Sequence, residues 1–199
     1  MSEQERNRGW TGVPAEHRGS EADENSVGFR SGGETSWGGV DPDAYRQVMG
    51  RFATGVSIVS TRSGGIDHAM TANALMSVSL EPLLLVISVE KEARFHDAVI
   101  DTGAWGVSLL PESERKTAAW LATRGRPLHG QLDRVKFHRG EQTGMALLDD
   151  ALGTIECHTF DTVSAGDHTL VIGNVLSVSI ADRPGDALIY YRGAFGVQH

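Results

Sequence analysis

Four small polar side chains, Thr71, Asn73, Ser77 and Ser79, fall within nine residues just before residues 83–89, one of the most apolar runs in the chain. Hydroxyl and amide groups are costly in a protein core unless they are hydrogen-bonded. Because residues two apart share one face of an extended segment, Ser77 and Ser79 face the same way, and Thr71 and Asn73 form a second such pair. The stretch is therefore either a solvated turn region, which is the commoner use of these residues, or a place where a polar ligand lies against an apolar wall.

Two further polar clusters lie where predicted strands end. Lys91 and Arg94 follow residues 83–89 at a strand-to-helix junction, where amide groups and two cations would suit a phosphate. The segment 166–168, Gly-Asp-His, lies in a predicted hairpin turn, and a histidine at such a rim can meet a ligand. Each cluster alone has an ordinary structural explanation, as a solvated helix start or a hairpin loop. Together in one small barrel they favour a site for a polar ligand with an anionic end.

The sequence lacks the common catalytic signatures. It contains no P-loop, no nucleophile elbow, no HExxH or CxxC motif, and no GxGxxG between a strand and a helix. Cys157 is the only cysteine, which excludes an intrachain disulfide and a cysteine metal cluster. Cys157 and His158 are neighbours in a predicted strand, so they face opposite ways and cannot share a metal ion. We therefore expect no resident metal.

Charge and composition narrow the classes of partner. The 199 residues include 18 basic and 26 acidic side chains, a net charge of −8, and 40% hydrophobic residues. Nucleic acids and anionic membranes require a basic face, so neither is expected as a partner. No apolar run approaches the roughly 20 residues of a membrane span, and the N-terminus lacks the core of a signal peptide. A cytoplasmic protein is the expectation.

Hairpins, rather than regular strand-helix repeats, organise the predicted elements. Residues 1–40 hold eight of the 24 glycines and no leucine or isoleucine, which predicts a disordered or weakly ordered tail before a folded domain over residues 41–199. A helix is expected to begin at Asp41 and Pro42. Further helices are expected at 90–103 and 111–124, and strands at 56–62, 66–70, 83–89, 104–110, 153–163, 168–180 and 186–195. This order predicts a mainly β (α+β) protein, an antiparallel barrel or sandwich with helices packed outside.

Several segments, in their order and spacing, resemble the flavin reductase family, whose fold is the FMN-binding split β-barrel. The similarity runs from about Tyr45 to Phe195, through RFATGVSIVST, MTANALMSVSLEP, ARFHDAV, WGVSLL, AGDHTLVIGNV and YYRGAF. The resemblance implies a split antiparallel β-barrel with flanking helices. It also implies hydride transfer from NADH or NADPH to FMN, with FAD possible, to supply reduced flavin to a partner monooxygenase. Members of the family are usually homodimers, so a homodimer is expected here.

The resemblance also implies roles for individual residues. Thr71, Ala72 and Asn73 would bind the polar edge of the flavin ring, and Ser77, Val78 and Ser79 would line the path of the ribityl chain. Ser88, Lys91, Arg94 and Phe95 would hold the phosphate or the adjoining chain. Asp167 and His168 belong to the turn implicated in nicotinamide binding, where His168 would orient the nicotinamide rather than act as a general base. Tyr191 and Arg192 belong to the C-terminal segment that reaches the site.

Two alternatives to a flavin reductase remain at this stage. The first is a flavin-binding or flavin-carrying barrel that does not turn over a nicotinamide, since fold alone does not decide the chemistry. The second is an interaction module in which every polar cluster is an ordinary loop. The family often has Ser or Thr where Phe95 stands, and this departure leaves the preference between FMN and FAD open.

Overall fold

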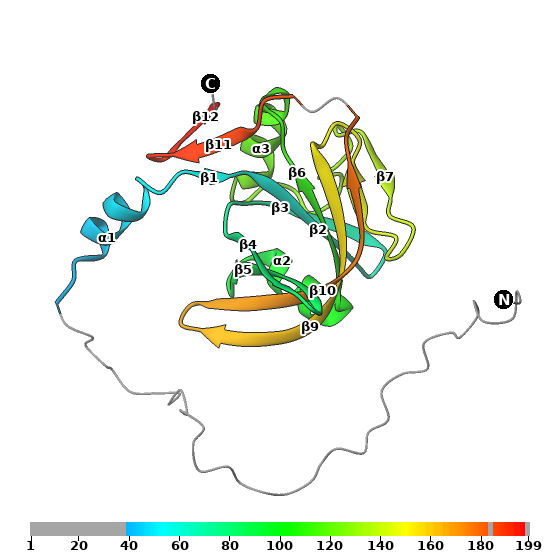
Figure 1. The fold of residues 1–199 in the computed structure, drawn as a ribbon, viewed down its shortest axis with the longest axis horizontal. Helices are drawn as coiled ribbons and strands as arrows, with labels where there is room; N and C mark the ends of the chain where they lie inside the picture. Colours follow the sequence, from blue (N-terminus) through cyan, green and yellow to red (C-terminus); the bar gives the residue numbers. More distant parts are fainter. Residues whose placement is uncertain (1–38, 183–184, 198–199) are drawn as a thin grey trace, which may run out of the picture. The chain divides into compact units, whose positions relative to one another are not determined.

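The computed structural model describes residues 39–182 and 185–197, and the tail expected over residues 1–40 falls almost wholly outside this part. Within it, one seven-stranded antiparallel sheet has the strand order β3-β2-β6-β9-β10-β5-β4 (Figure 1). The strands are β2 (Ser57–Ser63), β3 (Ile66–Ala72), β4 (Leu75–Leu80), β5 (Leu83–Glu90), β6 (Ala104–Leu109), β9 (Gly153–Ala165) and β10 (His168–Ile180). The predicted mainly β (α+β) class is confirmed.

The two edge strands of this sheet, β3 and β4, are consecutive in the chain and are separated only by Asn73 and Ala74. At that point the chain passes directly from one edge to the other, and the pairing of β4 with β5 extends to Ala74, because the Ser88 amide donates to the Ala74 carbonyl at 3.1 Å. Beyond it, β3 pairs with β2 alone among the described strands. The barrel is therefore closed at one end of β3 and split along the rest of that strand.

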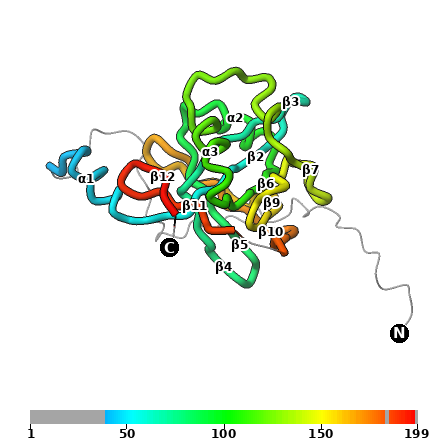
Figure 2. Tube along the Cα trace, turned by 90° about the horizontal axis from the view of Figure 1, so that it is seen from above, coloured from blue at the N-terminus to red at the C-terminus, as the bar shows by residue number. Residues whose placement is uncertain are grey.

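Smaller elements flank the sheet. The helix α1 (Pro42–Met49) leads into β1 (Thr54–Gly55), which pairs with β11 (Leu188–Tyr191), and β11 pairs in turn with β12 (Ala194–Val197). The helices α2 (Arg94–Thr102) and α3 (Arg115–Ala122) pack against β2 and β3 (Figure 2), and α3 follows a short 3-10 turn, η2 (Glu112–Glu114). A separate two-stranded sheet joins β7 (Phe137–Arg139) to β8 (Ala146–Leu148).

The C-terminal segment differs from the single strand expected over residues 186–195. It forms the hairpin β11–β12, because Arg192 and Gly193 have φ angles of 51° and 79°. Two successive positive φ values turn the chain within two residues and match the twist of a tight hairpin. Residues 75–80, which the sequence pattern left unassigned, form the edge strand β4.

Helix α1 begins as predicted. The Asp41 carboxylate accepts hydrogen bonds from the amides of Asp43 and Ala44 at 3.3 and 3.2 Å, and Pro42 occupies the first helical position. This cap satisfies amides that the helix itself leaves without partners. One side of the helix and the residues just after it carry an apolar stripe, Tyr45, Val48, Met49 and Phe52. These side chains are exposed rather than packed on the barrel.

The core has two parts, and β2 is buried between them. Ile58 packs in a cluster with Leu121 and Leu188, whereas its neighbour Val59 packs in a second cluster around the fully buried Trp105. Side chains alternate across a strand, so consecutive residues can serve opposite clusters. Gly173 lies against the indole of Trp105, where a Cβ atom would clash with the ring. The indole therefore requires glycine at this position.

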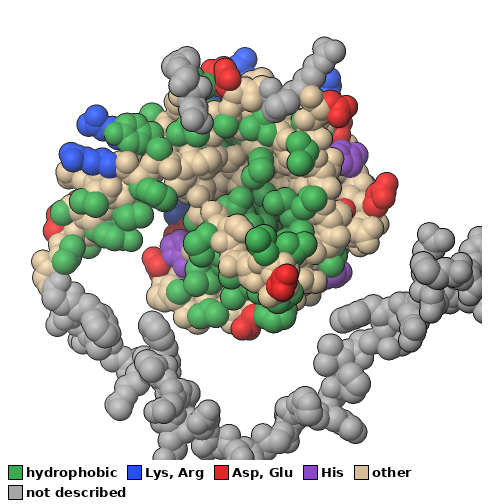
Figure 3. All heavy atoms as spheres, in the orientation of Figure 1, with side chains coloured by type: hydrophobic (Ala, Val, Ile, Leu, Met, Phe, Trp, Pro, Cys, Tyr) green, Lys and Arg blue, Asp and Glu red, His purple; other side chains and the backbone are tan. Residues whose placement is uncertain are grey.

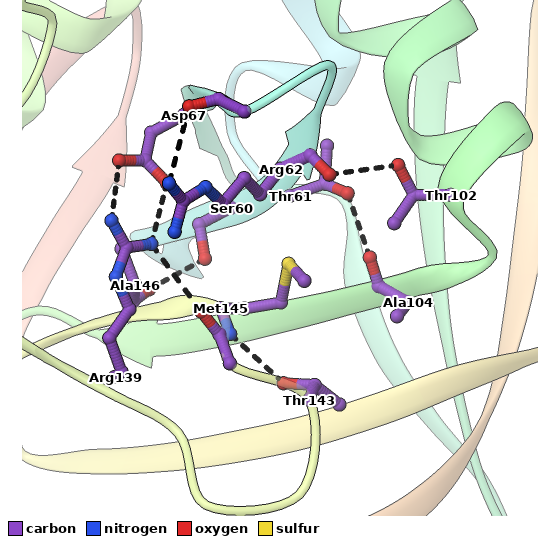
Figure 4. A network of polar contacts seen from close by, with 12 residues as sticks. Ser60, Thr61, Arg62, Asp67, Thr102, Ala104, Arg139, Thr143, Met145 and Ala146 are labelled. Carbon is purple, nitrogen blue, oxygen red and sulfur yellow. Dashed lines mark hydrogen bonds and ion pairs between the residues drawn. The ribbon is translucent and has the colours of Figure 1, made fainter.

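Buried hydroxyl groups on β2 form hydrogen bonds to two other strands, β8 and β6 (Figure 4). The Ser60 hydroxyl donates to the Ala146 carbonyl on β8 at 2.6 Å, and the Thr61 hydroxyl donates to a carbonyl of β6 at 2.8 Å. Near the β2–β3 hairpin, Arg139 forms a bidentate pair with Asp67 at 2.6 and 2.7 Å. The Arg139–Asp67 pair holds β3, which forms one wall of the cavity described below.

Glu156 on β9 is a carboxylate that is only 3% exposed. It accepts hydrogen bonds from the amides of Gln142 and Thr143 and from the hydroxyls of Thr143 and Ser177. Gly140 lies against it so closely that a Cβ atom would clash. Burial alone raises the pKa of Glu156, but the hydrogen bonds from Ser177, Thr143 and Gln142 outweigh it and hold the pKa below its ordinary value of 4.5. The ionised carboxylate therefore clamps the loop at 140–145 onto the barrel.

We predict that Glu156→Gln lowers the free energy of unfolding by about 1–3 kcal/mol at pH 7, because its amide group cannot accept from all the donors of this loop. A depressed pKa stabilises the fold above pH 4.5, and this contribution is lost as pH falls through the folded-state pKa. Urea unfolding should thus show a gap between wild type and variant that narrows in acid. A gap independent of pH would contradict this role, and Glu92→Gln, at an exposed glutamate, is the control.

Candidate functional site

A cavity of about 440 Å³ lies in the split beside the outer edge of β3. Its other walls are the end of β5, the start of α2, the end of α3 and the loop that follows α3. The lining residues are His68, Ala69, Met70, Thr71, Ala72, Asn73, Ala74, Ser88, Glu90, Glu92, Ala93, Arg94, Phe95, Leu121, Ala122, Arg124, Gly125, Arg126, Gln131 and His168. The cavity therefore gathers polar residues from every element that borders the split.

The outer edge of β3 presents backbone groups to this cavity. The Ala69 amide donates to Gln131 at 3.4 Å, and the Ala69 carbonyl accepts from Arg126. Backbone groups alternate in direction along an antiparallel strand, so those of Thr71, two residues on, point to the same edge. The Thr71 hydroxyl is used elsewhere, because it donates to the Ala118 carbonyl of α3 at 2.7 Å. Thr71 thus offers the cavity an amide and a carbonyl rather than a hydroxyl.

A cationic corner forms where α2 begins. Arg94, the first residue of α2, donates to the Arg126 carbonyl, and Ala93 before it supplies no side-chain cap to the first amides of the helix within the described residues. Burial and then the charge of Arg94 lower the pKa of His68, against the opposing effect of Asp67. Burial and then Arg94 also lower the pKa of Arg126. Basic groups that oppose one another's charge at a helix start form a site that an anion would stabilise.

The cavity is also lined by His168, the first residue of β10. Its Nδ1 lies 2.7 Å from the Asp167 carboxylate. The hydrogen bond from His168, followed by its charge, lowers the pKa of Asp167. Glu90, which pairs with His168 across β5 and β10, forms an ion pair with Arg124 at 2.7 Å. Opposite charges therefore meet where β5 ends and β10 begins.

The structure divides the residues that the sequence singled out into two groups. Lining the cavity are Thr71, Ala72, Asn73, Ser88, Arg94, Phe95 and His168. Ser77, Val78, Ser79, Lys91, Asp167, Tyr191 and Arg192 are not among the described residues that line it. The functional role assigned to each residue stays a prediction, and what the structure adds is its place.

The residues outside the lining have other contacts. The Lys91 ammonium donates to Ser164 and Gly166 at the β9–β10 turn. Val78 lies at a β-bulge of β4, where the pairing with β5 shifts between Ser77 and Ser79. Tyr191 and Arg192 belong to the β11–β12 hairpin, where the Arg192 amide donates to the Gly50 carbonyl at 2.7 Å.

Sequence reasoning missed His68, Glu90, Arg124, Arg126 and Gln131. The last three lie in a segment, RGRPLHGQ, that the sequence showed only as a loop punctuated by glycine and proline. Its two arginines and the amide of Gln131 were visible, but no local pattern indicates which sheet edge such a loop will meet. Long-range packing against β3 decides this, through Arg126 and Gln131.

The described part of the chain offers little support for a metal site or for a cysteine nucleophile. It contains no group of three or more histidine, cysteine or acidic residues placed to hold a metal ion. Burial, followed by the charge of Glu156, raises the pKa of the Cys157 thiol to about 12, so this side chain is a poor nucleophile. None of the described helices has the length and hydropathy of a membrane span.

Comparison with known proteins identifies the class. The profile of the flavin reductase like domain matches residues 49–198. An NADH-dependent flavin reductase of Rhodococcus sp is 35% identical over 159 residues, which cover 78% of this chain and 86% of the relative. The reductase component of 4-hydroxyphenylacetate 3-monooxygenase from Thermus thermophilus is 32% identical over 153 residues, which cover 77% of this chain and 94% of the relative. The crystal structure of BorF, the flavin reductase component of a bacterial two-component tryptophan halogenase, has a TM-score of 0.74 and 39% identity, covering 79% of this chain and 98% of BorF.

The chain belongs to the flavin reductase like family. The resemblance found in the sequence, the split β-barrel and the assignment to the flavin reductases as oxidoreductase enzymes are confirmed. The two alternatives, a carrier without turnover and a plain interaction module, are the less favoured interpretations of these matches.

We predict that Arg126→Met lowers the free energy of unfolding by about 1–3 kcal/mol, because Arg126 bonds Ala69, Gln131 and the Thr123 carbonyl from a half-buried position. Arg124→Met in the same loop should change it by less than about 1 kcal/mol, since its pair with Glu90 is a surface contact and Arg124 is 82% exposed. Urea unfolding of both variants checks the difference. Equal effects would show that Arg126 does not hold the loop against β3.

Proposed function

We propose that the cavity beside β3 binds the flavin, and that the chain reduces it with NADH or NADPH and releases reduced flavin to a separate monooxygenase. The observation that carries this proposal is one cavity with a polar strand edge along its length and a cationic corner at one end. The relatives named as an NADH-dependent flavin reductase and as a monooxygenase reductase component support the reductant and the partner. The cytoplasm, where pyridine nucleotides are plentiful, is the proposed place of action.

The residues of the cavity fit a flavin nucleotide. Its ring has a polar edge of alternating donors and acceptors, which matches the amide and carbonyl groups that Thr71 presents on β3 and the amide side chain of Asn73, which follows β3 and also lines the cavity. Its phosphate matches the corner formed by Arg94 and the uncapped amides at the start of α2. The ring and the phosphate of one flavin thus suit two different parts of the same cavity.

The chemistry requires little of the protein beyond geometry. When bound, the flavin supplies the hydride acceptor and the nicotinamide supplies the hydride. The chain holds the reactants together, excludes water and places donors along the ring edge. His168 keeps one imidazole nitrogen on Asp167, so its other nitrogen is left for the carboxamide of the reductant. No nucleophile or general base is needed, which agrees with the inert Cys157.

Removing the cation at the start of α2 tests the site. We predict that Arg94→Met raises the Kd for FMN by tenfold or more, because the loss of one charge-assisted hydrogen bond costs a binding free energy of about this size. The Kd for riboflavin, which lacks the phosphate, should change by less than about twofold. Flavin fluorescence quenching measures both constants, and FAD titrated in parallel decides which nucleotide is preferred. Anaerobic reduction of the bound flavin by NADH and by NADPH then separates an enzyme from a carrier.

The control is Arg51→Met, which removes an exposed arginine of the segment after α1 and should leave both constants unchanged. A loss of FMN and riboflavin binding in equal measure would place the phosphate away from Arg94. Tight flavin binding with no anaerobic reduction by either nucleotide would contradict the reductase proposal and favour a carrier.

We further propose that the chain is a homodimer. Apolar side chains are exposed on β4, β5, β9 and β10, and Figure 3 shows hydrophobic side chains gathered over this face of the barrel. They are Met76, Val78, Leu80, Leu83, Phe160, Val163, Leu176, Val178 and Ile180. The stripe of α1, Tyr45, Val48, Met49 and Phe52, is exposed as well. Exposed apolar areas of this extent mark interaction surfaces, and a second copy of this chain would cover them.

We predict that Leu80→Lys and Ile180→Lys together convert a dimer to a monomer at micromolar concentration, because both side chains are highly exposed, 78% and 81%, and a charge there must be desolvated in an interface. Sedimentation velocity measures the mass in solution. Ser63→Lys, on the β2–β3 hairpin, is the matched control. A monomeric wild type, or a double variant that stays dimeric, would place the interface elsewhere or exclude it.

A further inference from the structure

Lys91 directs its ammonium group at the turn between β9 and β10. Its Nζ donates to the Ser164 hydroxyl at 2.8 Å and to the Gly166 carbonyl at 2.7 Å, and its backbone amide donates to the Asp167 carbonyl at 2.9 Å. Three hydrogen bonds from one residue therefore reach a single turn. Two of them come from a charged group and are stronger than bonds between neutral groups.

The turn that Lys91 holds is short. Ala165 and His168 are paired residues of β9 and β10, so only Gly166 and Asp167 connect the strands. Gly166 has a φ of 62°, which a glycine at the first central position of a tight hairpin adopts without strain. The carbonyls of both central residues accept from Lys91, one from the side chain and one from the backbone. Next to the pairing of β10 with β5, which begins at His168 and Glu90, Lys91 thus adds two hydrogen bonds to the central residues of the turn.

The same turn sets the orientation of His168. Asp167 holds Nδ1 of His168 at 2.7 Å, and His168 lines the cavity as the first residue of β10. The hydrogen bond from His168 is the largest influence that lowers the pKa of Asp167, and the charge of Lys91 contributes in the same direction. Lys91 thus favours the ionised carboxylate on which the imidazole is held.

We propose that Lys91 is a positioning residue for the nicotinamide reductant, which fixes the Gly166–Asp167 turn so that His168 is presented to the cavity, and that it is not a ligand of the flavin phosphate. This inference rests on the proposed function, because it takes His168 as a contact of the reductant. Arg94, three residues further on, lines the cavity, whereas Lys91 is not among the described lining residues. Of the two cations at this junction, Arg94 therefore serves the binding of the flavin and Lys91 serves the positioning of the reductant.

The test compares three lysine variants of the full chain. Lys91→Met keeps the length of the side chain and removes its donors, Lys91→Arg keeps donors and charge, and Lys116→Met alters an exposed lysine of α3 as the control. We expect Lys91→Met to lower kcat/KM for NADH by about tenfold, since a small misplacement of a positioning group has effects of this order. The Kd for FMN should stay within about twofold, and Lys91→Arg should recover most of the loss.

A background without His168 separates positioning from a general structural effect. If Lys91 acts through His168, Lys91→Met adds no further loss of kcat/KM in a His168→Ala protein. A full additional loss in that background overturns the proposal. So does a Lys91→Met protein that binds FMN tenfold more weakly while its kcat and its KM for NADH at saturating FMN are unchanged, because Lys91 would then belong to the phosphate.

A readout independent of activity keeps this inference distinct from the proposed function. Amide hydrogen exchange at residues 165–168 should be faster in Lys91→Met than in wild type or Lys116→Met, and unchanged exchange overturns the proposal. If wild type binds FMN but fails to oxidise NADH and NADPH, the proposed function fails. Faster exchange in Lys91→Met would then still establish the anchoring of the turn, and the role of that turn toward the reductant would be wrong.

Discussion

The outer edge of β3 is the constraint on which the site depends. A strand edge leaves amides and carbonyls that must find partners, because an unpaired buried backbone group is costly. Among the described strands, β3 meets the other edge of the sheet where the chain runs through Asn73 and Ala74 into β4, and the barrel is open along the rest of β3. One part of this edge is satisfied within the chain, at Ala69, by Gln131 and Arg126. The part at Thr71 is left to face a cavity, and a planar ligand with a hydrogen-bonding edge can take the place of a missing strand.

The loop after α3 makes this arrangement possible because it covers the edge and the cavity together. Arg126 brings a guanidinium into a half-buried position and bonds the loop and β3 at once. Its charge and that of Arg94 oppose each other, which the lowered pKa of Arg126 reflects. The fold therefore tolerates a local repulsion that an anionic ligand would relieve. Such repulsion between like charges is an arrangement more typical of binding sites than of structural cores.

Local sequence patterns were sufficient to predict much of the fold. Alternation in β2, the apolar run of β5 and the Asp41–Pro42 start of α1 were visible, since each follows from neighbours in sequence. The hairpin at Arg192 was missed, because an arginine with positive φ gives no local warning. The residues of the site likewise fall into those that local sequence patterns indicate and those that they do not. Arg94 and His168 stood beside predicted element ends, whereas Arg126 and His68 reach the cavity only through tertiary packing. The family resemblance added what spacing could not, the identity of the ligand.

Residues 88–95 would serve both substrates of the proposed site from one short segment. It passes from the end of strand β5 into α2, and successive side chains leave it in different directions. Glu90 pairs with Arg124 and Lys91 with the β9–β10 turn, both on the side of His168, whereas Arg94 meets Arg126 at the cationic corner. A strand reverses its side chains at every residue, and a helix start sends them around an axis. In the proposed function, this strand-to-helix junction thus places the cation for the phosphate and the cation that positions the reductant only three residues apart.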